Sequence, residues 1–227
     1  MTTILRVQAS ARTTGSVSRK LSEAFVDAWR SAEPDVTVID RDLGRSPPPA
    51  VSEPWIAAAF TPDDQRNDEQ RKLLALSDEL IGELARADIV VIGTPMYNYG
   101  MPAALKAWFD QVIRINRTFT FDLARGDRPL EPILSGKSLV VLTSCGEFGF
   151  EPGGLNEGAG HLVPHIKTTS KYLGADHISH VGVEFQEFGD ERHEASKEQA
   201  FQDLAALVPA LQSRFAKAAR GRAEATA

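Results

Sequence analysis

The stretch IVVIGTPMYNYGMP, residues 89–102, contains a strand, a polar loop and the start of a helix. Its first part, Ile89–Ile92, is a continuous apolar run, which is typical of a strand buried on both faces of a sheet. Pro102 suits the first turn of a helix, because a peptide N–H has no helical partner there. The residues from Leu105 to Ile113 then repeat apolar side chains at helical spacing. This stretch predicts the central strand of a sheet and the helix that follows it.

The same alternation of strand and helix extends along the chain. Short apolar runs predict further strands near residues 4–7, 36–39, 139–142 and 177–183. Helical spacing predicts helices near residues 18–29, 73–84, 161–173 and 196–219, while residues 43–64, 117–135 and 150–160 are expected to be irregular. Strands that alternate with helices form a parallel sheet through right-handed crossovers. We therefore predict an α/β, doubly wound, five-stranded parallel sheet with helices on both faces, in one domain over residues 1–219, and a disordered tail over 220–227.

The composition excludes several classes of partner. The chain has 227 residues, a net charge of -6 and one cysteine. An acidic balance argues against binding to nucleic acid or to a membrane surface, both of which require clustered Lys and Arg. A single cysteine forms no internal disulfide, and no run approaches the length of about 18 apolar residues that a membrane span needs. We expect a soluble, cytoplasmic protein.

A Ser-rich loop follows the first predicted strand. Neither G-x-G-x-x-G nor G-x-x-x-x-G-K-[ST] occurs, so the dinucleotide fingerprint and the P-loop are both missing. Hydroxyl groups and free peptide N–H groups at a helix N-terminus bind a phosphate monoester without a lysine, as flavodoxin-like folds bind FMN. Capping of the helix by a serine explains the same residues about equally well at this stage. The residues concerned are Ser10, Ser16, Val17 and Ser18.

Two further polar loops follow the predicted strands at 89–92 and 139–142. Ligands of open α/β sheets bind beyond the carboxyl ends of the strands, so the three loops describe one site. The second loop offers aromatic surfaces and an amide for an isoalloxazine ring, although aromatic side chains covering the sheet end would give the same pattern. The third loop can direct peptide N–H groups to the pyrimidine edge of the ring. The residues are Pro95, Met96, Tyr97, Asn98 and Tyr99 in the second loop, and Ser144, Cys145, Gly146 and Glu147 in the third.

At these residues the chain resembles the FMN-dependent NADH-azoreductases, which are related to flavodoxin-like NAD(P)H:quinone reductases. The resemblance implies a homodimer with one FMN in each subunit, the phosphate at the serines and the ring against the second and third loops. It implies a ping-pong reaction in which NADH or NADPH reduces the flavin and an azo compound or quinone reoxidises it. The substrates would lie over the flavin at the subunit interface. Cys145 and Glu147 depart from the pattern of many relatives.

Other chemistry receives little support from the sequence. No side chain is required as a general acid, so we predict no catalytic residue. Phe119, Phe121 and Tyr172 are candidates for the wall of the substrate pocket. His161 and His165 have helical spacing but no carboxylate or thiol at ligand spacing, so we expect no metal. A flavodoxin-type electron carrier without its own organic substrate is the alternative function, but the three long irregular segments favour an enzyme with a walled pocket.

Overall fold

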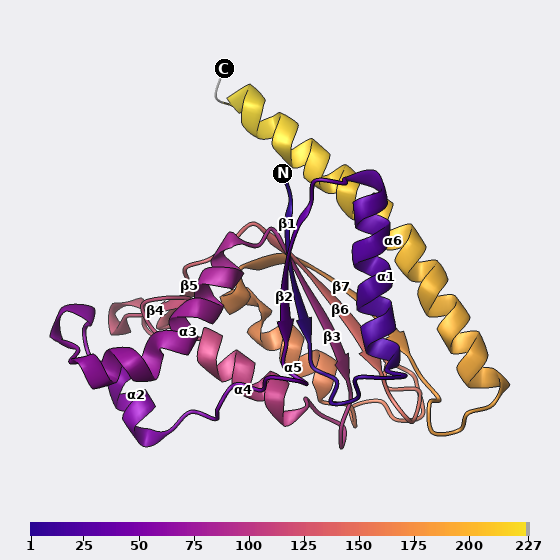
Figure 1. Ribbon diagram of the computed structural model, residues 1–227, viewed down its shortest axis with the longest axis horizontal. Coiled ribbons are helices and arrows are strands. Elements are labelled where there is room, and N and C mark those ends of the chain that lie inside the picture. Colours follow the sequence, from indigo (N-terminus) through magenta and orange to yellow (C-terminus); the bar gives the residue numbers. More distant parts are fainter. Residues whose placement is uncertain (226–227) are drawn as a thin grey trace.

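A twisted parallel sheet forms the centre of the computed structural model, which describes residues 1–225 and the side chains of residues 1–216 (Figure 1). Within this part of the chain, five strands pair in the order β2-β1-β3-β6-β7, and every pair of neighbours is parallel. The predicted five-stranded parallel sheet is confirmed. The strands are β1 Thr3–Gln8, β2 Thr37–Asp42, β3 Ile89–Pro95, β6 Lys137–Ser144 and β7 Ala175–Val183.

Helices cover both faces of the sheet (Figure 1). On one face α1 (Val17–Ala32) and α6 (Glu191–Ala225) form one apolar cluster with the sheet. On the other face α3 (Asp68–Arg86), α4 (Ala103–Val112) and α5 (Leu162–Thr169) form a second cluster. The predicted segment 161–173 is thus α5 continued by the short 3-10 helix η3, Ser170–Leu173.

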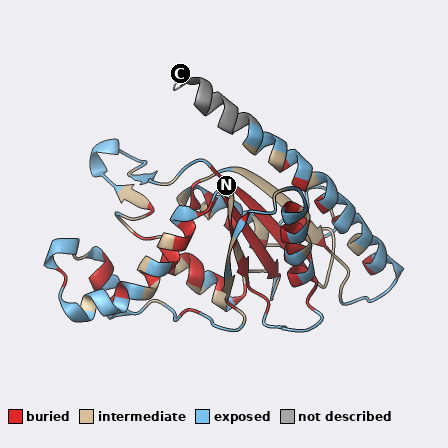
Figure 2. Ribbon diagram, turned by 45° about the horizontal axis from the view of Figure 1, so that its top comes forward, coloured by how far each residue is buried: buried red, intermediate tan, exposed pale blue. Residues whose placement is uncertain are grey.

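The central strand β3 explains why its sequence is apolar without interruption. Ile89 and Val91 pack with α1 and α6, whereas Val90 and Ile92 pack with α3, α4 and α5. Successive side chains of a strand point to opposite faces, so a strand covered on both sides must be apolar at every position. Figure 2 shows the resulting layer of buried residues in the middle of the molecule.

The proline-rich segment after β2 is more regular than its sequence indicates. Helix α2 spans Glu53–Phe60, a stretch that we expected to be irregular. Pro54 lies in the first turn of this helix, where proline is tolerated, and the Ser52 hydroxyl accepts a hydrogen bond of 3.4 Å from the Trp55 N–H. The short 3-10 helix η1, Asp63–Gln65, follows it. The prediction was wrong because it counted the prolines without considering their position in the turn.

A small antiparallel hairpin lies within the second segment expected to be irregular. Its strands are β4, Phe119–Phe121, and β5, Leu130–Pro132, with the 3-10 helix η2, Leu123–Arg125, between them. The third segment, 150–160, is irregular as predicted. The two three-residue strands are too short to show a periodicity in the sequence.

The last helix is longer than predicted. We expected it to span 196–219, but α6 extends over Glu191–Ala225. The proposed disordered tail over 220–227 therefore overlaps this helix, and its last part, 226–227, lies outside the described residues. The domain boundary at residue 219 stays a prediction.

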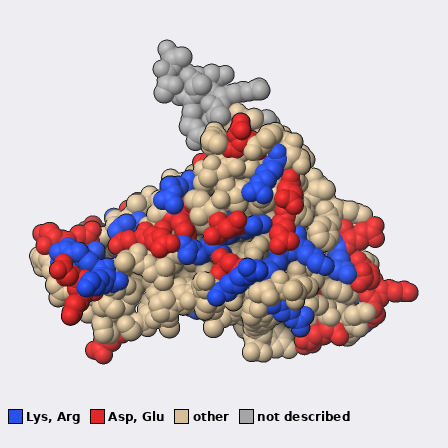
Figure 3. Space-filling model, viewed as in Figure 1, with Lys and Arg blue, Asp and Glu red and all other residues tan. Residues whose placement is uncertain are grey.

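Charged side chains of both signs are interspersed over the face of the molecule shown in Figure 3. No helix of the described residues has the length and apolar character needed to cross a membrane.

Candidate functional site

Three loops meet at the carboxyl ends of the central strands. Backbone hydrogen bonds join the ends of these strands: the Ala9 N–H donates to the Gly93 carbonyl at 2.9 Å, and the Met96 N–H donates to the Ser144 carbonyl at 2.8 Å. Pro95 and Ser144 face each other in the β3–β6 register. The structure therefore brings the three predicted loops to one edge of the sheet.

The serines of the first loop gather at the N-terminus of α1. Ser10, Ser16 and Ser18 are all buried, and the hydroxyl oxygens of Ser16 and Ser18 are 3.4 Å apart. Ser16 is also the N-cap of α1, because its hydroxyl accepts a 3.4 Å hydrogen bond from the Arg19 N–H. Within the described residues, the peptide N–H groups of Ser16, Val17 and Ser18 have no hydrogen-bond partner. Capping and anion binding are thus compatible here, because the cap uses one hydroxyl and leaves the first N–H groups free.

The second loop is a tight turn with unusual backbone angles. Asn98 and Tyr99 have φ values of 46° and 62°, in the left-handed region. Reciprocal hydrogen bonds of 3.1 and 3.0 Å between Tyr97 and Gly100 close the turn, and the His161 N–H donates to the Tyr99 carbonyl at 2.7 Å. Tyr97 and Tyr99 are 39% and 45% exposed, so they do not serve mainly to cover the end of the sheet. They are available to contact a ligand.

The third loop is supported by the segment after β7. The N–H groups of Phe185, Gln186 and Glu187 donate to the carbonyls of Glu147, Cys145 and Gly146 at 3.1–3.2 Å. A Cβ atom on Gly146 would lie 2.5 Å from the Glu187 side chain. The carbonyl groups of the third loop are therefore occupied by hydrogen bonds within the protein.

The N–H groups of the third loop are used differently. That of Cys145 donates to the Val183 carbonyl, but those of Gly146 and Glu147 have no partner among the described residues. The loop thus offers two N–H groups to a ligand.

A side-chain hydrogen bond joins the second and third loops. The Tyr99 hydroxyl donates to Glu147 Oε1 at 3.0 Å. This hydrogen bond and the negative charge of Glu147 raise the pKa of the Tyr99 phenol, because both favour the protonated form. The bridge depends on Glu147, one of the two positions at which we expected the sequence to depart from many relatives.

Cys145, in the third loop, is a buried free cysteine. Its thiol contacts the Glu147 carbonyl at 3.3 Å, and burial together with nearby Glu184 raises its pKa to about 12. A thiol with so high a pKa is a poor nucleophile. Among the described residues, no group of three or more His, Cys, Asp or Glu side chains is arranged to hold a metal ion.

A cavity of about 940 Å³ lies beside the second and third loops and is lined in part by the segment 149–160. Met96 and Cys145 border it, but the serines of the first loop do not. On its wall the ring of His180 is 2.9 Å from the Thr143 hydroxyl, and burial lowers the pKa of His180. The cavity has the size of a small-molecule site.

Comparison with known proteins identifies the family of this chain. A family model described as a flavodoxin-like fold matches residues 2–208. FMN-dependent NADH:quinone oxidoreductase 2 of Colwellia psychrerythraea is 53% identical over 218 residues, which cover 93% of this chain and 100% of the relative. The chain belongs to the flavodoxin-like family of FMN-dependent NADH:quinone oxidoreductases. FMN-dependent NAD(P)H:quinone oxidoreductase 1 of Pseudomonas aeruginosa is 44% identical, with 92% of this chain and 99% of the relative covered.

Solved structures agree with this family. The crystal structure of an azoreductase from Bacillus anthracis str. Sterne has a TM-score of 0.81 and 25% sequence identity, and the match covers 92% of this chain and 99% of that chain. The resemblance to azoreductases and quinone reductases that the sequence indicated is confirmed, and so is the flavodoxin-like fold.

The three predicted pocket residues of this family member lie away from the second and third loops. Phe119 and Tyr172 contact each other, with ring centroids 5.5 Å apart, and Phe121 is half exposed in β4. They follow the carboxyl ends of α4 and α5, helices that start near the site and run back along the sheet. Within one chain they therefore lie toward the amino ends of the strands. Their role as the pocket wall stays a prediction.

Sequence reasoning missed the polar wall of the cavity in this oxidoreductase. Thr143 and His180 were not among the predicted site residues. Thr143 in β6 pairs with Gly182 in the neighbouring strand β7, and its hydroxyl contacts His180 of the same strand, so all three belong to one face of the sheet end. The alternation of apolar and polar residues along β7 was the available signal, because Val181 and Val183 pack on the opposite face.

Proposed function

We propose that the chain passes electrons from NADH or NADPH to quinones and azo compounds through bound FMN. Membership of the family makes it an FMN-dependent oxidoreductase. The observation that supports the proposed FMN site is that three loops meet at one edge of the sheet. Among the described residues, the first and third loops have free N–H groups there, and the second loop has exposed tyrosines. Each of these features corresponds to one part of the FMN molecule.

The residues present fit an FMN molecule. The phosphate would be held by the hydroxyls of Ser10, Ser16 and Ser18 and by the N–H groups at the start of α1, where the helix dipole favours an anion. The ring would lie against Pro95, Met96, Tyr97, Asn98 and Tyr99 on one side and Ser144, Cys145, Gly146 and Glu147 on the other. Bound FMN supplies the hydride and electron chemistry, while these residues hold it and orient it.

We propose that two copies of the chain form the working unit. The predicted pocket residues lie away from the second and third loops of their own chain, so a second copy is the natural source of a pocket wall. Large exposed apolar side chains, including Phe60 at 68% and Leu123 at 75% exposure, are consistent with a surface that packs against another subunit. The nicotinamide donor and the quinone or azo acceptor would then bind in turn over the flavin at the subunit interface, which is a ping-pong order.

The alternative is an electron carrier without an organic substrate. The cavity of about 940 Å³ beside Met96 and Cys145 favours the enzyme, because a carrier needs no space for a second molecule. We also propose a cytoplasmic location, because a single cysteine is compatible with a reducing compartment.

Stopped-flow mixing of the FMN-loaded protein with NADH, without oxygen, separates the two functions. We expect NADH alone to bleach the visible absorbance of the flavin, and a quinone added afterwards to restore it. If the absorbance changes only after a separate reductase protein is added, the chain is a carrier and the proposal is wrong.

A further inference from the structure

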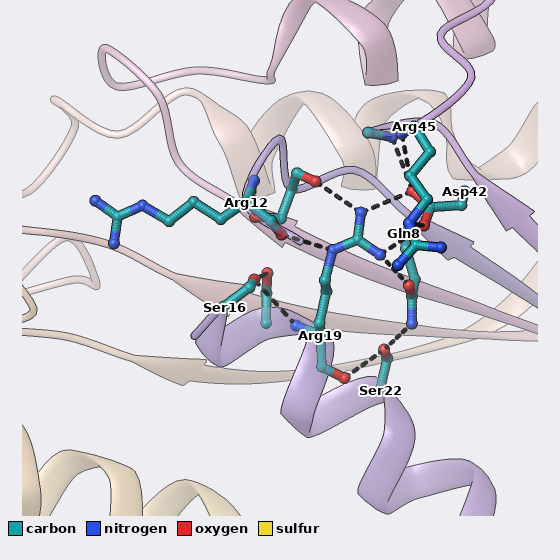
Figure 4. Close-up of polar contacts among 10 residues, drawn as sticks. Gln8, Arg12, Ser16, Arg19, Ser22, Asp42 and Arg45 are labelled. Atoms are coloured by element: carbon teal, nitrogen blue, oxygen red, sulfur yellow. Dashed lines mark hydrogen bonds and ion pairs between the residues drawn. The ribbon is translucent and has the colours of Figure 1, made fainter. Parts of the chain in front are cut away.

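Arg19, in the first turn of α1, lies at the centre of a buried hydrogen-bond network (Figure 4). Its side chain is only 7% exposed. Two of its nitrogens bind the Asp42 carboxylate at 2.7 Å each, and one of these also donates to Gln8 Oε1. Its remaining donors reach two carbonyl oxygens of the first loop, those of Arg12 at 2.9 Å and Ser10 at 2.8 Å. All five N–H groups of the guanidinium are therefore used.

These contacts join α1 to the end of β1, to the loop directly after β1 and to the end of β2. Gln8 ends β1, Asp42 ends β2, and Ser10 and Arg12 belong to the loop that carries the phosphate-binding serines. Asp42 also accepts hydrogen bonds of 3.1 Å from the N–H groups of Gly44 and Arg45. The hydrogen bond from Arg19 is the largest cause of the lowered pKa of Asp42, so this carboxylate stays charged.

The network fixes the side of the loop that faces away from the ligand. The Arg19 guanidinium binds carbonyl oxygens of the loop and none of the hydroxyls of Ser10, Ser16 and Ser18. Residues 11–15 of this loop, Arg12 among them, are exposed. In Figure 4 the Arg12 side chain extends away from the network, so only its backbone takes part: its carbonyl accepts from Arg19, and its N–H donates to the Ser10 hydroxyl at 3.2 Å.

The charge of Arg19 is already compensated by Asp42. A guanidinium that binds a carboxylate through two nitrogens, and that has no free N–H, offers no donor to a phosphate. Its effect on a bound anion must therefore act through the shape of the loop. This distinguishes Arg19 from an arginine that binds a phosphate directly.

We propose that Arg19 is a positioning residue that holds the first loop in the shape required by the phosphate of FMN. The inference rests on the proposed function, since it needs the phosphate at Ser10, Ser16 and Ser18. A loop that is already ordered loses less conformational freedom on binding, so removal of the anchors must weaken the complex. The effect is confined to ligands that carry the phosphate.

The test compares the binding of FMN and of riboflavin, which lacks the phosphate, to the full-length protein freed of flavin. We expect Arg19→Gln to raise the Kd of FMN at least tenfold and to change that of riboflavin less than twofold. Arg19→Lys keeps the charge but not the planar set of five donors, so it should weaken FMN binding by a similar factor. Arg41→Gln is the matched control, because Arg41 in β2 forms ion pairs with Glu79 and Glu83 and does not touch the loop.

Trypsin gives a second measurement that does not involve flavin. The bond after Arg12 should be cut at least tenfold faster in the flavin-free Arg19→Gln and Arg19→Lys proteins than in the wild type or in Arg41→Gln. If Arg19→Gln does not fold, Arg19→Lys decides alone. Full FMN affinity in Arg19→Lys, equal losses for FMN and riboflavin, or an equal loss in Arg41→Gln would each overturn the inference.

Ser18→Ala separates this inference from the proposed function. If Ser18→Ala weakens FMN binding and the Arg19 variants do not, only the positioning role is wrong. If Ser18→Ala and the Arg19 variants all bind FMN like the wild type, the phosphate lies elsewhere and the proposed site itself is wrong.

Discussion

Gly44→Ala should damage both the stability of the protein and its binding of FMN. Gly44 follows Asp42 at the end of β2 and packs directly against the first loop. A Cβ atom at this position would lie 2.0 Å from the Ser10 carbonyl oxygen and 2.7 Å from a guanidinium nitrogen of Arg19. The obstruction is mainly backbone, which cannot move away as the end of a flexible side chain can.

The size of the effect follows from this overlap. Real Cβ atoms almost never approach closer than 3.0 Å, so the loop or the end of β2 must move by about 1 Å. Overpacking of this kind costs about 1–3 kcal/mol. For a domain of this length each kcal/mol lowers Tm by roughly 2–4 °C, which gives a fall of about 2–12 °C. The displaced groups include the Ser10 backbone, so we expect the Kd of FMN to rise as well.

Gly82→Ala provides a control with the opposite expected sign. Gly82 lies inside α3, and a Cβ atom there would meet only the end of the Arg86 side chain, at 3.5 Å. Replacement of a helical glycine by alanine stabilises by roughly 0.5–1 kcal/mol, so Tm should rise by about 1–4 °C. Circular dichroism melts without flavin and calorimetric titration with FMN measure both effects. If Gly44→Ala melts and binds FMN like Gly82→Ala, the close packing described here is wrong.

Three further predictions concern single side chains. Ser18→Ala removes a buried hydroxyl from the proposed phosphate site. It should raise the Kd of FMN by about 10- to 140-fold, which is the effect of losing a hydrogen bond to a charged group. The control is Ser138→Ala, at a buried serine at the opposite end of the sheet, which should leave the Kd of FMN unchanged. With a pKa of about 12, only about one Cys145 in ten thousand is a thiolate at pH 8, so iodoacetamide should label it only after unfolding, and rapid labelling of the native protein would contradict its burial. The lowered pKa of Asp42 contributes stability above its ordinary value of 3.8, and this contribution is lost as the pH falls through the lower folded value. The stability difference between wild type and Asp42→Asn in urea should therefore shrink from pH 6 to pH 3, and a constant difference would refute the ion pair.

The sequence predicted those parts of the fold that depend on local patterns. The strand at 89–95 is recognisable because burial on both faces leaves no polar position in its core. The loops of the site are recognisable because the carboxyl ends of parallel strands meet at one edge. Both inferences need only the order of residues along the chain and the geometry of a parallel sheet.

The missing parts depend on contacts between distant segments. Arg19 and Asp42 are 23 residues apart, and nothing local in the sequence pairs them. Ser16 illustrates a different difficulty, because helix capping and phosphate binding select the same residue type at the same position. The structure shows N–H groups beside Ser16 that have no partner among the described residues. Helix capping by Ser16 therefore leaves donors for a phosphate.

The two ends of the site are built by different means, and this difference fits the proposed reaction. At the proposed phosphate end, the serines are buried and the Arg19 network holds the loop that carries them, so the ligand need not move there. At the ring end, Tyr97 and Tyr99 are exposed, and the cavity beside Met96 is open to a second molecule. A cofactor that must meet two substrates in turn has to be held by its tail and left accessible at its reactive ring. The affinity for FMN should therefore come mainly from the first loop, while the choice of substrate is made at the second and third loops.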